Sequence, residues 1–204
     1  DPAGRPAGLR AGPAARVHHH DHRWWLGRAQ VGLAGVNVPA AAQHLGGAVD
    51  QFRKAADRAA QLAPTLPIAK LQRQDILLEL AEAYQTNKQF NEAVTTLQQV
   101  LNEAPAVDRA ELALQRLTTA LHLAGKFKES DDACIRFAQT YPQSPLLPGV
   151  QFRATENALA TAEAAYADPK FPNRATALKP LFTEVITRST KFLPAYPEFP
   201  EINL

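Results

Sequence analysis

Residues 74–105 read QDILLELAEAYQTNKQFNEAVTTLQQVLNEAP, two amphipathic segments joined by a short polar connection. In the first segment apolar residues recur every three or four positions, at Leu77, Leu80, Ala81 and Tyr84. The second segment keeps this spacing from an aromatic residue at its start to a proline that stops it, through Phe90, Ala93, Leu97, Val100 and Pro105. This periodicity is typical of helices, so the stretch predicts a hairpin of two helices.

The same pattern returns 37 residues later in the chain. Its positions are Leu114, Leu117, Thr118, Leu121, Phe127, Ser130, Cys134, Phe137 and Pro142. Small residues at Ala81 and Ala93 let the two helices of the first hairpin approach closely. Because Thr118 and Ser130 replace them in the second copy, we expect looser packing there.

The two copies, at about 74–107 and 111–144, resemble tetratricopeptide (TPR) repeats. The resemblance implies an all-α fold in which antiparallel hairpins stack as a short α-solenoid. It also implies a concave surface lined by the first helix of each repeat, which would bind a protein partner. The residues placed there are Asp75, Leu78, Glu82, Gln85, Leu112, Gln115, Thr119 and His122. Leu78, Glu82, Gln115 and Thr119 lack the Lys, Asn and Arg side chains with which chaperone adaptors of this family clamp a terminal carboxylate.

Flanking helices extend the predicted helical domain to residues 39–193. An earlier apolar stripe predicts a helix over about 48–62, and later stripes predict one over about 147–166 and a partner helix. Pro180 would lie either at the first turn of this partner or at a kink in it. Asp108 and Glu111 have the spacing of a capping box at the start of the helix that begins the second copy.

Residues 1–38 are rich in Ala, Gly, Pro and Arg and show no apolar period, so they predict an irregular leader. Translation of GC-rich sequence in the wrong frame gives a similar composition. Trp24 and Trp25 within this leader suggest an anchor onto the domain, a partner or a membrane interface.

The last residues, 194–204, predict an extended tail. Pro194, Pro197 and Pro200 are spaced by three, which favours a polyproline-like conformation. Tyr196 and Phe199 would dock this tail onto the domain or onto a partner.

Residues 18–22 read HHHDH and raise the possibility of a metal site. In a helix, His18 and His22 would share a face and could hold one divalent ion. A metal-binding or enzyme-accessory protein is therefore the alternative function. Adventitious binding by a His-rich tract is the interpretation preferred here, so we expect no metal and no cofactor.

The sequence lacks a phosphate-binding loop, a dinucleotide fingerprint and a GxSxG motif, so we expect no enzyme. Glu79 and Glu82 share a helix face and are interpreted as solvated surface residues, and Cys134 as a small buried hydrophobe. The net charge of +2 gives no indication of a nucleic-acid partner.

The segment FAQTYPQSPLLPGVQFRA (137–154) is similar to repeat junctions of bacterial outer-membrane assembly lipoproteins and related periplasmic proteins. That similarity favours the bacterial envelope over the cytoplasm. The chain begins at Asp1 and contains no methionine, so a signal or lipid anchor lies beyond inspection. We expect membrane association only through such a missing N-terminus or through Trp24 and Trp25. Together the patterns predict a protein-interaction module or scaffold subunit of a larger assembly.

Overall fold

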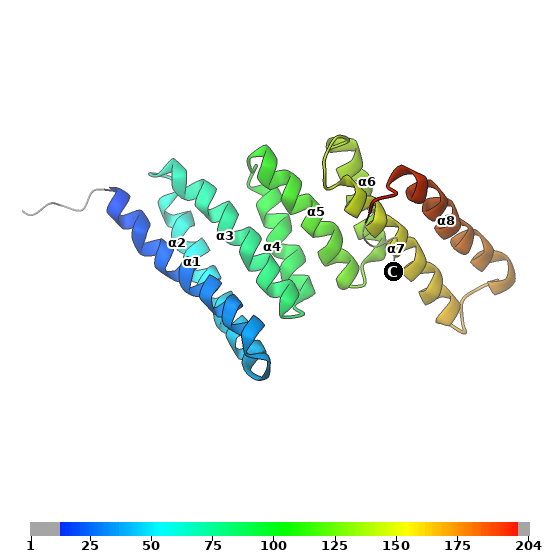
Figure 1. The fold of residues 1–204 in the computed structure, drawn as a ribbon, viewed down its shortest axis with the longest axis horizontal. Coiled ribbons are helices and arrows are strands. Elements are labelled where there is room, and N and C mark those ends of the chain that lie inside the picture. The colour runs from blue at the N-terminus through cyan, green and yellow to red at the C-terminus, as the bar shows by residue number, and fades with distance from the viewer. Residues whose placement is uncertain (1–12, 200–204) are drawn as a thin grey trace, which may run out of the picture. The chain divides into compact units, whose positions relative to one another are not determined.

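The computed structural model describes residues 13–199, with side chains from His22 onward except that of Ala175. Within this range eight α-helices and one short 3₁₀ turn make up the regular structure (Figure 1). The chain divides into two compact units, one ending at Gln89 and the other beginning at Phe90. Each unit is built from successive helices that pack on their neighbours. The all-α hairpin architecture predicted from the sequence is confirmed.

The first unit contains α1 (Pro13–Val36), a 3₁₀ turn (Val38–Ala40), α2 (Ala41–Leu62) and α3 (Pro67–Thr86). Helix α2 packs on both of the other helices, and α1 also touches α3. The predicted stripe of α2 is buried at Leu45, Val49, Phe52, Ala56 and Ala59. The helix begins seven residues before the predicted position 48, at Ala41.

The prediction of an irregular leader over residues 1–38 is wrong for the segment Pro13–Val36, which forms α1. No proline interrupts this segment after its first residue, where proline fits the open first turn of a helix. Alanine and arginine add favourable helix propensity. Packing against α2 supplies the remaining stabilisation of α1, because a helix in a protein is stabilised mainly by the neighbour that covers it.

Two glycines that look like helix breakers in the sequence lie at the contact between α1 and α2. A Cβ atom at Gly27 would lie 2.6 Å from the ring of Phe52, and one at Gly47 would lie 2.7 Å from the side-chain amide of Gln30. Both are nearer than real Cβ contacts come. Glycine at position 27 therefore permits the close approach of the two helices, because the Phe52 ring is buried, whereas the flexible amide of Gln30 can yield to a side chain at position 47.

The second unit contains α4 (Phe90–Asn102), α5 (Val107–Leu123), α6 (Phe127–Thr140), α7 (Leu147–Ala167) and α8 (Arg174–Ala195). Each helix packs on the next, and α5 also contacts α7 (Figure 1). Gly125 adopts a positive φ of 72° in the tight connection between α5 and α6. Pro180 lies inside α8 and not in its first turn, the first of its two predicted places.

The predicted capping box at Asp108 and Glu111 is wrong. Helix α5 begins at Val107 after Ala106, which makes no side-chain capping bond. Glu111 instead accepts a hydrogen bond from the hydroxyl of Ser144, which precedes α7. The carboxylate is therefore used to join two elements rather than to cap its own helix.

The repeat pattern read from the sequence corresponds to the buried positions of the two hairpin segments. In 74–105 the buried members are Leu77, Leu80, Ala81, Tyr84, Ala93, Leu97 and Val100. In the second copy they are Leu114, Leu117, Thr118, Leu121, Ser130, Cys134 and Phe137. The aromatic residues at the starts of the second helices, Phe90 and Phe127, are half-buried.

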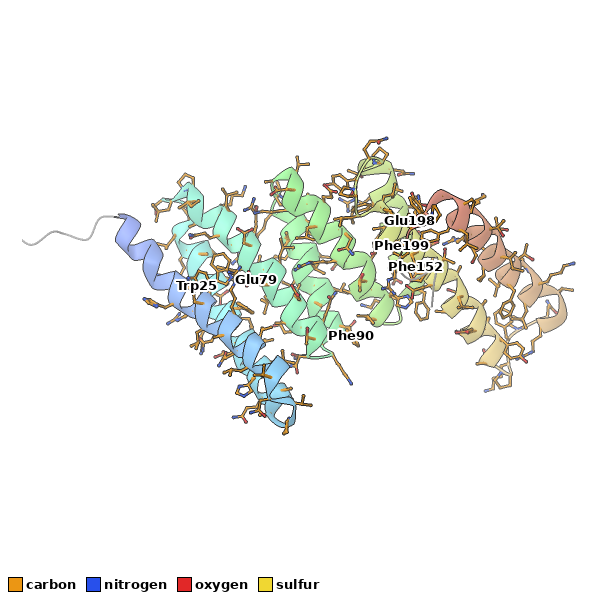
Figure 2. All side chains as sticks on the ribbon, viewed as in Figure 1. Trp25, Glu79, Phe90, Phe152, Glu198 and Phe199 are labelled. Carbon is orange, nitrogen blue, oxygen red and sulfur yellow. The ribbon has the colours of Figure 1, made fainter. Side chains whose placement is uncertain are left out.

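The extended tail predicted for residues 194–204 is wrong over its first part. Pro194 and the following alanine belong to α8, and residues 196–199 form a turn in which the Phe199 amide donates to the Tyr196 carbonyl over 3.1 Å. The ring of Phe199 lies 5.3 Å from those of both Phe152 and Phe192, measured between centroids (Figure 2). Aromatic packing thus draws the tail back onto α7 and α8. The last five residues of the prediction lie outside the described part.

We predict that Gly27→Ala and Gly32→Ala have opposite effects on the free energy of unfolding. A Cβ at Gly32 meets open space. Alanine there should raise the free energy of unfolding by about 0.5–1 kcal/mol, because alanine has the higher helix propensity. Alanine at Gly27 would press on the buried ring of Phe52, and overpacking costs about 1–3 kcal/mol. Urea unfolding followed by circular dichroism measures both changes. Equal stabilisation by the two substitutions would contradict the packing of α1 on α2.

Candidate interaction surfaces

In the first unit, Glu79 on α3, which is labelled in Figure 2, accepts hydrogen bonds from two side chains of α1. The indole nitrogen of Trp24 donates to Oε2 over 2.9 Å, and Nε of Arg28 donates to the same oxygen over 2.8 Å. The guanidinium carbon of Arg28 lies 4.7 Å from the centroid of the Trp24 ring and 5.1 Å from that of Trp25. The hydrogen bond to Glu79 raises the pKa of Arg28. This cluster, Trp24–Arg28–Glu79, holds α1 against α3.

The cluster changes the interpretation of three residues singled out in the sequence. Glu79 is not a freely solvated carboxylate, because its side chain is 24% exposed and paired with α1. Trp24 is half-buried and attached to its own domain, the first of the three predicted roles. Trp25 is 59% exposed, so its role as a partner or membrane anchor stays a prediction.

Fewer of the predicted binding residues of α3 are accessible than the sequence suggested. Leu78 is 5% exposed, so the prediction that it lines an accessible surface is wrong. Asp75 and Gln85 are half-buried and Glu82 is exposed. Leu78 occupies a core position because α3 buries apolar residues on more than one side, with Ile76, Leu77 and Leu80 also in the core.

The predicted binding face of α5 lies in the second unit and is described there by itself. Leu112, Gln115 and Thr119 are half-buried and lie along α5 at helical spacing. His122, the fourth member, already has a partner within the unit, since its Nδ1 lies 2.7 Å from Oδ1 of Asn157 on α7. The face available to a partner is therefore centred on Leu112, Gln115 and Thr119.

Asn157 is the centre of a buried polar network. Its Nδ2 donates to Oγ of Ser130 over 2.8 Å, and that hydroxyl donates to the backbone carbonyl of Thr118 over 2.7 Å. Because the amide nitrogen donates to Ser130, Oδ1 is the acceptor and Nδ1 of His122 carries the proton. Side chains from α5, α6 and α7 are thereby joined in one network.

The polar residues Thr118 and Ser130 therefore do not loosen the second hairpin as the sequence suggested. Both are buried and hydrogen-bonded, Thr118 through its hydroxyl to the Gln115 carbonyl over 2.7 Å. A buried polar group costs stability only when it lacks a partner. The sequence signal that pointed to both residues was their replacement of alanine, but the repeat pattern does not indicate that Ser130 has a partner on α7.

The described residues hold no group of three or more His, Cys, Asp or Glu side chains able to bind a metal ion. The metal hypothesis concerns His18, His19, His20 and Asp21, whose side chains lie outside the described part, and His22, which is exposed. Among the helices described, none is long and apolar enough to span a membrane. Cys134 is buried, and this burial raises the pKa of its thiol to about 12, which agrees with a packing role.

The family model described as tetratricopeptide repeat matches residues 75–106. Those residues are a tetratricopeptide repeat. Two crystal structures of the nearly identical TPR-like repeats of a putative kinesin light chain from Podosopora anserina, one of them a variant with a single substitution, are similar in fold. Their identities are 20% and 19% and their TM-scores 0.52 and 0.53, with 90% of this chain and 80% and 79% of theirs covered. No curated protein sequence matches the chain.

The matched segment runs from within α3 through α4, and α5 with α6 follows as the second TPR-like hairpin. Helix α1 and the Asn157 network fall outside the matched segment. The repeat pattern could not indicate them, because both depend on contacts between residues 27 to 55 positions apart in the chain. The bacterial envelope setting stays a prediction from the sequence.

We predict that Asn157→Ala lowers the free energy of unfolding by about 1–3 kcal/mol. The substitution removes the partner of both Ser130 and His122, and an unpaired buried polar group costs about that much. Asn91→Ala on the exposed surface of α4 is the matched control, with an expected change within about 0.5 kcal/mol. Urea unfolding measures both. A neutral Asn157→Ala would show that the network does not support the unit.

Proposed function

We propose that this chain is a non-catalytic protein-interaction module that acts as a scaffold or subunit of a larger assembly. The observation that carries the proposal is the packing of successive helices within each unit, together with the tetratricopeptide repeat at residues 75–106. Repeats of this kind are held together by contacts with their neighbours and leave one face of each hairpin exposed. TPR repeats are generally interaction modules rather than enzymes.

The α5 face supports this proposal in the second unit. Leu112, Gln115 and Thr119 combine an apolar side chain with two neutral polar ones, and none of the three is charged. Depletion of charge with retained hydrogen-bonding capacity is characteristic of the centre of a protein interface. None of these three side chains is a cation that could clamp an acidic chain end, so we expect the partner to contribute apolar and neutral polar groups to them.

The geometry of the described clusters supports a binding role over a catalytic one. Trp24–Arg28–Glu79 joins two helices of one unit, and the Asn157 network joins three helices of the other. The thiol of Cys134 is buried, and its raised pKa disfavours the thiolate that a nucleophile requires. These groups are used to hold the fold.

We predict that Thr119→Arg removes a partner that the unaltered protein retains. The full chain, with an affinity tag, is purified gently from its native source, and its companions are quantified by mass spectrometry. An arginine at this half-buried position would place a large charged group in the centre of the α5 face, and we expect recovery of a stoichiometric partner to fall about tenfold.

Thr190→Arg, at an exposed position of α8, is the matched control and should leave recovery unchanged. Circular dichroism confirms that both variants are folded. Equal recovery of the partner with both variants would show that the partner does not bind at the α5 face. A monomer without any stoichiometric companion would contradict the proposed function itself.

A further inference from the structure

A groove in the second unit runs between α6 and α8, with α7 as its floor. Arg188 of α8 crosses it and donates to both carboxylate oxygens of Asp131 on α6, over 2.5 and 2.9 Å. The same guanidinium donates to the carbonyl of Ala154 on α7 over 2.8 Å and to Glu184 over 2.7 Å. These bonds fix the separation of the two walls, and hydrogen bonding to Asp131 raises the pKa of Arg188.

On one side of this crossing lies a pocket of about 250 Å³. Its lining is mainly apolar and comes from all three helices, with Cys134, Ile135, Ala138, Val150, Ala154 and Phe192. The wall at Phe192 is rigid, because that ring packs against the aromatic rings of Phe152, Tyr196 and Phe199. Ile135 at the rim is 50% exposed, so an occupant would cover apolar surface that water now contacts.

The two ends of the groove differ in charge. Lys191 lines the apolar pocket, and no described side chain forms an ion pair or hydrogen bond with its ammonium group. Beyond the Arg188 crossing the groove continues past Asp132 and Glu184, together with Lys128. The carboxylates at that end are already paired, Asp132 with Lys128 over 3.2 Å and Glu184 with Arg188 over 2.7 Å. An occupant that places a carboxylate beside Lys191 therefore meets a cation at the apolar end.

The size of the pocket decides what kind of occupant fits. Pockets that enclose a whole small molecule measure about 300–1,000 Å³, whereas a cavity of about 150 Å³ holds a benzene ring. A volume of about 250 Å³ therefore accommodates one large apolar side chain. Such anchor side chains, seated in a preformed pocket and flanked by polar groups, contribute most of the affinity of many protein interfaces.

Building on the interaction role proposed above, we propose that the α6–α8 groove binds a segment of a protein partner. One large apolar side chain of that segment enters the pocket between Ala138, Val150 and Phe192, and an adjacent acidic residue pairs with Lys191. This surface is distinct from the α5 face. It is recognised by an apolar anchor next to negative charge, whereas the α5 face offers neutral polar contacts.

Three fluorescent peptides test the proposal on the full chain. GSEEFGSG carries the anchor and the acidic residues, GSKKFGSG carries the anchor with reversed charge, and GSEEAGSG lacks the anchor. We expect GSEEFGSG to bind saturably, as measured by fluorescence anisotropy, and the other two to bind about tenfold more weakly. Amide chemical shifts in ¹⁵N-labelled protein should change in α6 and α8 around Ile135 and Lys191.

Lys191→Glu supplies the decisive variant, because it reverses one exposed charge without touching the core. We expect it to lower the affinity for GSEEFGSG about tenfold and to raise the affinity for GSKKFGSG. Lys179→Glu makes the same charge change on α8 outside the pocket and should leave both affinities as they are. Equal effects of the two substitutions would overturn the proposal.

The remaining outcomes separate this proposal from the general interaction function. The absence of saturable binding of GSEEFGSG at millimolar concentration would overturn the proposed binding site in the groove. It would leave the general interaction function to be decided by the partner-capture experiment. Shifts confined to Leu112, Gln115 and Thr119 would also overturn the groove and would support the α5 face instead.

Discussion

The close approach of neighbouring helices at alanine and glycine is the constraint on which the rest of the structure depends. Fully buried alanines occur in both units, at Ala48, Ala55, Ala81, Ala93, Ala113, Ala120 and Ala162. Small residues at the contacts let neighbouring helices approach closely. Larger residues such as Phe52 and Phe137 then fill the remaining space. Each unit is thus stabilised by successive neighbour contacts, which leaves the outward faces open for binding.

The repeat pattern predicted the hairpin segments because their core positions are local, recurring every three or four residues within each helix. It could not predict α1, since glycine has low helix propensity and the value of Gly27 lies in a contact with α2. Gly27 shows this directly, because its lack of a side chain makes room for Phe52, 25 residues later. The tail was also misread, because three prolines outweighed the aromatic residues that pack it onto α7 and α8.

The candidate surfaces were predictable only in part. The repeat resemblance placed Gln115 and Thr119 on a partly accessible face, but it also placed Leu78 there, which is core. The same resemblance gave no indication that His122 is already hydrogen-bonded to α7, or that α6 and α8 form a groove. Both features come from the divergent last hairpin, where the repeat spacing ends and only the three-dimensional packing shows which side chains meet.

Hydrogen exchange of the full chain, followed by mass spectrometry, tests most directly whether neighbour packing holds every helix in place. We expect the backbone amides of residues 24–36 in α1 to exchange as slowly as those of α2, because Trp24, Gly27 and Arg28 fix α1 to its unit. Exchange of this segment at the rate of an unfolded chain, with α2 protected, would contradict it. The exposed apolar surface of α2 would then become the first place to look for a partner.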